Sequence, residues 1–297
     1  PEISRISGEW VGNLSNTCYN PRSRLAEAGA VIIPVMRSGQ KGHMSEPTAK
    51  AKRPDYGIDA PVAVRNLALG GAAALGLAVV AHALHWAHVA RMAAPVAIGW
   101  LFFAGWFVWD GKVGKVWARE RLLDLLPWRG DEAVLDVGCG RGLLLIGAAK
   151  RLTTGKAIGV DIWRSEDLSG NHPAATQENA RLEGVSDRVE INTGDARSLP
   201  FADGTFDVVL TDAVLHNISS AAQRDTAVRE IARVLKPGGR LLLGDVRHTG
   251  RYAQVLRQSG LQDVRRSPQS LPSLLIAAIS LGFAYPATVR ARKPAAA

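Results

Sequence analysis

Cysteine is scarce in this sequence of 297 residues, which contains only two cysteines and seven histidines. Cys18 lies in a polar stretch near the beginning of the sequence, and Cys139 lies inside a glycine-rich turn. Two isolated thiols provide neither a disulfide framework nor the ligand spacing of a metal-binding motif. We therefore expect no metal site, and we expect the folded part to reside in a reducing compartment.

The sequence also lacks a basic patch interleaved with aromatic residues, although its formal net charge is +9. The lysines and arginines are spread along the chain, which argues against nucleic acid as a partner. An anionic, cytoplasmic membrane face explains an excess of basic residues better.

Two long apolar runs lie between the N-terminal segment and the part of the chain that begins at residue 113. Leu67 to Ala81 contains no polar side chain, and the run extends to residue 90 with histidines as its only polar residues; Met92 to Trp109 contains no charge. A membrane-spanning helix needs about 20 apolar residues. We therefore expect a transmembrane helical hairpin over residues 56–112, with membrane lipid as a partner. A helical hairpin buried against a soluble domain is the alternative.

The charges around the two runs predict their orientation. The connection between the runs contains a single charged residue, Arg91. By the positive-inside rule, both ends of the hairpin then lie in the cytoplasm, and the domain that follows faces the cytoplasm at the membrane. The basic residues that flank the pair are Lys50, Lys52, Arg53 and Arg65 before it, and Lys112, Lys115, Arg119 and Arg121 after it.

The hairpin carries a small-residue stripe and three histidines. Gly70, Ala74 and Ala78 repeat every four residues, which lets membrane helices approach closely. His82, His85 and His88 follow at spacings of three, which on a continuous helix would fan them apart and prevent joint coordination of a metal.

Residues 1–55 are rich in serine, arginine, lysine, proline and glycine, and we expect them to be disordered. The sequence begins at Pro1, and Met44 resembles a natural start, so the residues before Met44 are excluded from the fold.

From residue 113 to residue 297, apolar strands alternate with helical segments. A helix is expected from about Trp117, after a short linker. Such alternation predicts an α/β domain with a mainly parallel sheet. The predicted strands are Ala133–Val137, Lys156–Asp161, Val189–Thr193, Phe206–Thr211, Arg240–Val246, a sixth near Asp263–Arg266, and Ala287–Arg292.

The first of these strands runs into a glycine-rich turn in "VLDVGCGRGLLL", Val134–Leu145. A dinucleotide fingerprint would require a third glycine at position 143, which is Leu143, and the lysine of a phosphate-binding loop is absent. The turn therefore favours a nucleoside ligand without a pyrophosphate. A turn that only packs a helix on a strand is the alternative.

Three further motifs follow in order. Asp161 ends the second strand 23 residues after Gly138, "NTGDARSLPF" follows the third strand, and "RVLKPGGRLLLGD" (Arg233–Asp245) contains the fifth. Together with the glycine turn, the set resembles the class I S-adenosylmethionine-dependent methyltransferases of the small-molecule and quinone-biosynthesis branch, over about residues 117–266. The resemblance implies a Rossmann-like seven-stranded methyltransferase sheet flanked by helices, here preceded by two transmembrane helices.

The resemblance also implies roles for individual residues at the carboxyl ends of the strands, with S-adenosyl-L-methionine as the cofactor. The methionine part of the cofactor would be held by the carboxylate that precedes the turn and by the turn's backbone, the ribose by the acid that ends the second strand, and the adenine by the residues that follow. The implied cofactor-binding residues are Asp136, Gly138, Cys139, Gly140 and Gly142, with Cys139 as small filler; Asp161, Ile162 and Trp163; Asp195 for the adenine amino group and Ala196 for the ring; and Thr211.

His216, in "TDAVLHNISS" after the fourth strand, is the candidate catalytic base; a histidine that packs or caps a helix is the alternative. No D/N-P-P-Y/F motif follows that strand, which argues against methylation of a nucleic-acid base amine. The domain contains one cysteine, whereas arsenite methylation would need several thiolates. Leu271–Tyr285 is apolar and is expected to be a lid, an interfacial helix or a core helix.

The resulting hypothesis is a membrane-anchored methyltransferase acting on a small, lipophilic acceptor. A membrane-bound cofactor sensor or scaffold without turnover is the alternative.

Overall fold

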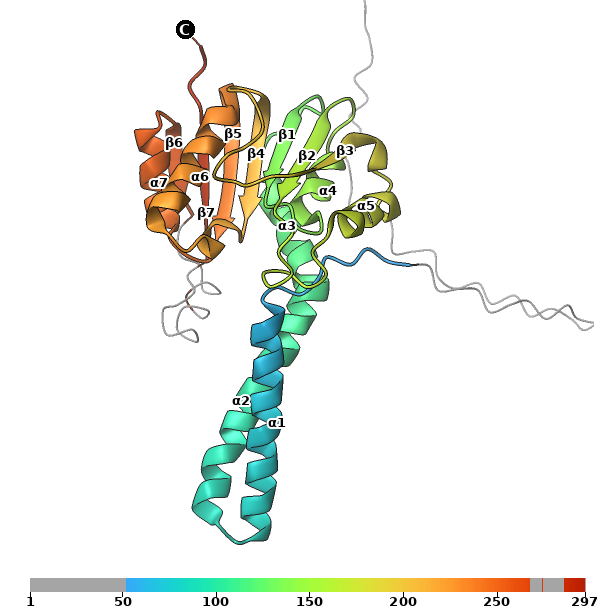
Figure 1. Ribbon diagram of the computed structural model, residues 1–297, viewed down its shortest axis with the longest axis vertical. Coiled ribbons are helices and arrows are strands. Elements are labelled where there is room, and N and C mark those ends of the chain that lie inside the picture. Colours follow the sequence, from blue (N-terminus) through green and yellow to red (C-terminus); the bar gives the residue numbers. More distant parts are fainter. Residues whose placement is uncertain (1–51, 268–273, 275–285, 297) are drawn as a thin grey trace, which may run out of the picture. The chain divides into compact units, whose positions relative to one another are not determined.

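The computed structural model describes residues 52–267, residue 274 and residues 286–296 (Figure 1). The expected N-terminal segment as far as residue 51, and the apolar segment 271–285 apart from residue 274, lie outside the described residues. A seven-stranded sheet with its flanking helices, together with two long apolar helices, makes up most of the described chain. The sheet positions the candidate site.

The sheet has the strand order β3-β2-β1-β4-β5-β7-β6, in which β7 runs antiparallel to both of its neighbours. The pairs among β1 to β5 are parallel. The predicted α/β class and the seven strands are thus confirmed. Their bounds are β1 (Ala133–Val137), β2 (Lys156–Asp161), β3 (Val189–Thr193), β4 (Phe206–Asp212), β5 (Leu235–Asp245), β6 (Gln262–Arg266) and β7 (Ala287–Arg292).

Helices cover both faces of the sheet because successive strand residues point to opposite sides (Figure 1). In β5, Leu242 packs with the helices α3 (Lys115–Leu123), α4 (Leu143–Ala149) and α5 (Pro173–Leu182). Its neighbours Leu241 and Leu243 pack with α6 (Ala221–Val234) and α7 (Thr249–Gln258) on the other face. Two short 3₁₀ turns, η2 (Ser186–Arg188) and η3 (Leu215–Asn217), complete the domain.

The fifth strand was predicted to begin at Arg240, whereas β5 begins at Leu235 and includes Pro237–Gly239. Phe206 pairs with Leu235, and the next pair is Val208 with Arg240, so β5 bulges between these two pairs. Gly238 adopts a φ of +77°, which permits the bulge. The Pro-Gly-Gly signal therefore marks an irregularity within a strand.

The two apolar runs form the helices α1 (Pro61–Ala83) and α2 (Ala87–Trp109). Both are long and apolar enough to cross a membrane, by length and composition only. They pack through small residues: a Cβ atom added to Gly70 would lie 2.2 Å from the Trp100 ring, and Ala81 and Ala97 are fully buried. Their outer faces expose large apolar side chains, with Met92 exposed by 74%. The described part of the hairpin is therefore not buried against the domain as a soluble core helix would be.

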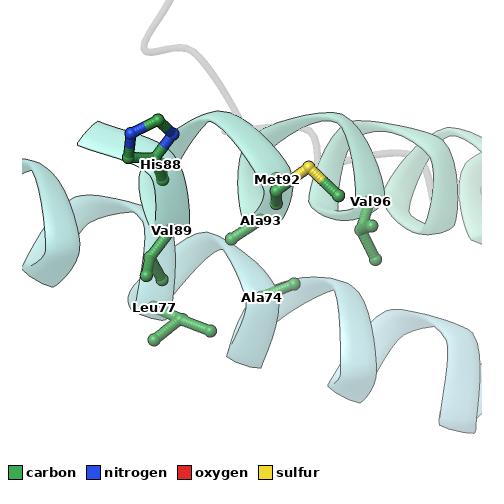
Figure 2. A pocket seen from close by; sticks show the side chains of 7 residues that line it. All are labelled: Ala74, Leu77, His88, Val89, Met92, Ala93 and Val96. Carbon is green, nitrogen blue, oxygen red and sulfur yellow. The ribbon is translucent and has the colours of Figure 1, made fainter. Parts of the chain in front are cut away.

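An open apolar groove lies between α1 and α2 (Figure 2). It contains none of the residues predicted for the cofactor or for catalysis. Its lining residues are Ala74, Leu77, His88, Val89, Met92, Ala93 and Val96.

The expectation that His82, His85 and His88 lie on one continuous helix was wrong. His82 belongs to α1 and His88 to α2, whereas His85 lies in the turn between them with a φ of +60°. The three side chains therefore do not share one helix. The ring of His88 lies 3.1 Å from Arg91, its neighbour on the same helix.

The expected linker between the hairpin and the domain is helical. The π-helical turn η1 (Asp110–Gly114) joins α2 directly to α3, which begins at Lys115 and not near Trp117. The chain from Ala87 to Leu123 is thus one helix of 37 residues. The hairpin leads into the domain without a flexible segment.

Candidate functional site

Side chains with acid groups gather where the parallel strands end. Asp136 lies near the end of β1, Asp161 ends β2, Asp212 ends β4 and Asp245 ends β5. Ligands of open α/β sheets bind beyond the carboxyl ends of the strands. The sheet order brings these residues together, because β1 lies between β2 and β4, and β5 is the next strand.

The glycine turn between β1 and α4 depends on its three glycines. Gly138, Gly140 and Gly142 have φ values of +74°, +51° and +86°, which other residues rarely adopt. A Cβ atom on Gly138 would lie 2.4 Å from the Val214 side chain. The turn is held to β2 by the Gly138 N–H, which donates to the Val160 carbonyl at 2.7 Å. Because these glycines have no Cβ atom, neighbouring groups can approach the backbone of the turn closely.

Cys139, within this turn, has its side chain inside the core. The residue is 5% exposed, and burial raises the pKa of its thiol well above the usual value. A buried, protonated thiol is a poor nucleophile. These properties fit the role of small filler.

Asp136 is almost fully buried. Burial raises the pKa of its carboxyl group to about 8, the nearby charges of Asp212 and Asp161 act in the same direction, and a hydrogen bond from the Leu145 backbone opposes them. A carboxyl group held neutral in this way lacks a cationic partner. A cation bound beside Asp136 would therefore favour the ionised form of this buried carboxyl group.

Asp161 fixes the residues around it through both of its oxygens. The Gly140 N–H donates to Oδ2 at 2.8 Å, and the Trp163 N–H and the Asn171 side-chain amide donate to Oδ1 at 2.6 and 3.2 Å. Asp161 thus ties the glycine turn to the loop after β2. Carboxylate oxygens have further lone pairs that can accept bonds from ribose hydroxyls.

The residues after Asp161 offer an apolar surface. Ile162 is 52% exposed, an unusual position for such a side chain beside a polar turn. The Trp163 indole donates to the hydroxyl of Thr193, which ends β3, at 2.9 Å. These contacts place both residues at the same edge as Asp161, where a flat ring could pack.

Asp195, after β3, is engaged by a neighbour. The Arg197 guanidinium donates to both of its oxygens, and this contact holds the pKa of the carboxyl group below its usual range. Ala196 lies between them, partly buried against the core. The structure thus places Asp195 at the site edge in an ion pair that the sequence motif did not predict.

Thr211 is 1% exposed, and its hydroxyl lacks a hydrogen-bond partner among the described residues. Buried hydroxyl groups normally have a partner. The next residue, Asp212, was missed. Water reaches this residue, but close packing of protein atoms around the carboxyl group, together with the charges of Asp245 and Asp59, raises its pKa to about 7. The sequence signal that could have identified Asp212 was its position at the end of a buried strand.

His216 has a partner that the sequence reasoning also missed. Its Nδ1 lies 2.6 Å from Oδ1 of Asp245, and its backbone N–H donates to Oδ2 of the same carboxylate at 3.0 Å. The Asp245 side chain is fully buried, whereas that of His216 is 22% exposed. A buried acid therefore orients a histidine that still faces the site.

The donor set at this edge fits a cationic nucleoside. Buried acids attract the cation, Asp161 can accept from a ribose diol, Ile162 provides an apolar surface, and the Thr211 hydroxyl has free hydrogen-bonding capacity. S-adenosylmethionine combines these groups in one molecule.

Comparison with known proteins decides the kind of domain. Residues 135–243 match the family model described as a methyltransferase domain. The chain contains a methyltransferase domain. S-adenosylmethionine is the cofactor of this kind of domain, in agreement with the donor set. The match spans β1 to β5 and thus includes the glycine turn, Asp161 and His216.

Individual relatives share the methyltransferase domain. The 27-O-demethylrifamycin SV methyltransferase of Amycolatopsis mediterranei is 36% identical over 126 residues, 42% of this chain and 43% of that protein. The ubiquinone/menaquinone biosynthesis C-methyltransferase UbiE of Roseobacter denitrificans is 33% identical over 131 residues, 44% of this chain and 48% of that protein. The chain thus spans less than half the length of these relatives. Among solved structures, the [4+2]-cyclase SpnF has a TM-score of 0.49 at 24% identity, covering 61% of this chain and 81% of that chain.

Proposed function

We propose that this chain is a membrane-anchored methyltransferase that transfers a methyl group from S-adenosylmethionine to a small, lipophilic acceptor. The observation that carries the proposal is the edge of the sheet where the glycine turn, Asp136 and Asp161 meet the oriented His216. When bound, the cofactor supplies a methyl group on a sulfonium sulfur, so the protein's main task is to position the reactants.

Each site residue has a task in this proposal. Asp136 and the backbone of the glycine turn hold the methionine part of the cofactor. Asp161 accepts from the ribose hydroxyls, and Ile162 and Trp163 lie against the adenine. Asp195 and Ala196 complete the adenine site.

His216 acts as the general base. Because the buried Asp245 carboxylate lies against Nδ1, that nitrogen carries the proton and Nε2 is left to accept one. Nε2 would take the proton that the acceptor's nucleophilic atom loses on methylation. Asp245 holds the ring in this tautomer and stabilises the charged imidazolium that results.

The base of the hairpin supports a lipophilic acceptor. Lys115, at the start of α3, donates to Asp59, two residues before the start of α1, at 3.2 Å. The charges of both residues act on Asp212, at the carboxyl end of β4. The hairpin thus begins and ends at the ligand edge of the sheet. If α1 and α2 span a membrane, an acceptor dissolved in lipid reaches this edge without crossing water.

The exposed apolar side chains of α1 and α2 support anchoring in the membrane. Basic residues flank the hairpin and are scarce in its turn, which favours a cytoplasmic location for the methyltransferase domain. The two relatives are a methyltransferase of ubiquinone/menaquinone biosynthesis and a 27-O-demethylrifamycin SV methyltransferase, which agrees with an acceptor of small molecular size.

Turnover is tested with the full chain in lipid nanodiscs, S-adenosylmethionine labelled in its methyl group, and a lipid extract. We expect S-adenosylhomocysteine to form together with a labelled product that partitions into organic solvent. Binding of the cofactor without formation of S-adenosylhomocysteine would instead favour the sensor or scaffold. A labelled product that stays in water would overturn the lipophilic acceptor.

The orientation gives a second expected result. A cysteine introduced by His85→Cys, in the turn of the hairpin, should react with a membrane-impermeant maleimide in intact cells. The matched variant Lys112→Cys should react only after the cells are permeabilised, because residue 112 lies at the cytoplasmic end. Labelling of both positions in intact cells, or of neither position before permeabilisation, would contradict the proposed topology.

The affinity for S-adenosylmethionine is expected to rise between pH 6 and pH 7.5. The pKa of Asp136 is about 8 without a ligand, so the carboxyl group is mostly neutral at pH 6, and a bound cation favours its ionised form. Linkage then strengthens binding by up to about tenfold per pH unit below that pKa. Calorimetry at constant ionic strength measures the slope. In Asp136→Asn the affinity should be weak and should lose this dependence; an equal slope in both proteins would exclude Asp136 as its source.

A further inference from the structure

The residues just before the hairpin pack on the cofactor side of the domain. We name residues 55–60 the strap. The strap pairs with the loop between β2 and α5: the Ala60 N–H donates to the Asp167 carbonyl at 3.0 Å, and the Ser169 N–H donates to the Ile58 carbonyl at 3.0 Å. The Ile58 N–H donates to the Ser169 hydroxyl at 2.7 Å. This loop directly follows Asp161.

The strap also holds the glycine turn. Asp55 pairs with Arg141, which lies between Gly140 and Gly142, at 3.1 Å. Asn179 of α5 connects the two backbones, because its amide donates to the carbonyls of Asp55 and Arg141 at 2.8 and 2.9 Å. The Arg141 guanidinium also donates to the Ser169 carbonyl at 3.1 Å. One arginine of the turn is thus clamped between the strap and the loop.

Gly57 allows the strap to lie this close. Its φ is +72°, and an added Cβ atom would lie 2.7 Å from the Ser169 carbonyl oxygen and 3.1 Å from the Arg141 side chain. Leu168, from the same loop, packs beside Gly140. A Cβ atom added to Gly140 would lie 2.8 Å from a methyl group of Leu168. Strap, loop and glycine turn therefore form one packed layer.

Tyr56 anchors this layer to the helices. The residue is 5% exposed, its hydroxyl donates to Glu183 at 2.8 Å and accepts from Arg119 at 3.2 Å, and its carbonyl accepts from Lys115 at 3.1 Å. Burial and the bond to Glu183 raise the pKa of the tyrosine above its usual value. Tyr56 thus fixes the strap to the helices, while the two ends of the strap are bonded to the glycine turn and to the loop after β2.

We infer that the strap is part of the cofactor site, with Asp55 and Gly57 as positioning residues for S-adenosylmethionine. The inference rests on the proposed use of that cofactor. The strap sets the distance between the turn that receives the methionine part and the loop that follows the ribose-binding acid. The domain from residue 113 onward is therefore an incomplete cofactor-binding unit, although it contains every residue of the sequence motifs.

The test compares Gly57→Ala with Gly184→Ala in the full chain in detergent micelles. Gly184 has a similar φ of +70°, but an added Cβ atom would meet nothing within 4 Å, so this variant controls for backbone strain alone. Calorimetry with S-adenosylmethionine should show binding weakened by about tenfold or more in Gly57→Ala and by much less in Gly184→Ala.

Asp55→Ala keeps the inference open to refutation should Gly57→Ala fail to fold. The Asp55 side chain is 56% exposed, so its loss leaves the core intact, yet binding should weaken severalfold because Arg141 loses its partner. Hydrogen exchange should show lower protection of the Ser169 amide in both strap variants. Wild-type affinity in a folded Asp55→Ala or Gly57→Ala variant would overturn the role of the strap. Failure of the wild-type chain to bind S-adenosylmethionine would instead overturn the proposed function.

Discussion

Asp161→Ala is expected to weaken the binding of S-adenosylmethionine by about 2–3 kcal/mol, or roughly 30- to 150-fold in Kd. The carboxylate is the proposed acceptor for both ribose hydroxyls. It also accepts from the Gly140 and Trp163 amides at 2.8 and 2.6 Å, so its loss removes the bonds that hold the glycine turn to the loop after β2. Calorimetry with the full chain measures the change.

Asp131→Ala is the matched control for this substitution. Asp131 is an exposed acid at the opposite end of β1, where it pairs with Arg129, and its loss should leave affinity unchanged. Thermal unfolding of both variants separates loss of binding from loss of fold. A folded Asp161→Ala protein with wild-type affinity would remove Asp161 from the ribose site.

Local signals explain why the strands could be predicted closely. The bounds of β1, β2, β3 and β7 match the prediction residue for residue, because each is a short apolar or alternating run bounded by polar or glycine-rich segments. Along β1, for example, only Ala133 is not fully buried, as expected for a strand covered on both faces. Such burial leaves a pattern in the sequence that does not depend on distant residues.

The short linker expected before Trp117 was wrong because its glycines serve a tertiary contact. Gly111 and Gly114 lie in this segment, and both belong to a continuous helix. A Cβ atom on Gly111 would lie 3.2 Å from the Gly57 carbonyl oxygen, so this glycine makes room for the strap. A glycine that serves close approach and a glycine that ends a helix are identical in the sequence.

The site divides in the same way. Asp136, the glycine turn and Asp161 belong to contiguous motifs, so their common edge followed from the order of the strands. Other contacts at the site join residues far apart in the sequence. Asp245 lies 29 residues after its partner His216, and Asp55 lies 124 residues before its partner Asn179. Contacts over such separations depend on the folded topology, which is why the strap and the acid behind the histidine were not predicted.

His216→Ala is expected to lower kcat by about 10²- to 10⁴-fold in the nanodisc assay with the lipid extract, with little change in the affinity for S-adenosylmethionine. The imidazole is proposed to take the acceptor's proton, and it is not among the residues that hold the cofactor. Asp245→Asn should reduce kcat by less than His216→Ala. The amide keeps the shape of the carboxylate but cannot stabilise the imidazolium, and it favours the wrong tautomer of the ring.

The comparison of the two variants distinguishes a base from a packing residue. Added imidazole should restore part of the activity of His216→Ala, because the His216 side chain is 22% exposed and solvent can reach its place. Imidazole should not rescue Asp245→Asn, in which the ring is still present. A purely structural role predicts instead that both substitutions lower the unfolding temperature and that imidazole rescues neither. Retention of kcat within about threefold in a folded His216→Ala protein would mean that His216 is not the general base. His216 would then serve to bind η3 to the end of β5 through Asp245, and the search for a base would move to Asp212, whose pKa of about 7 suits proton transfer near neutral pH.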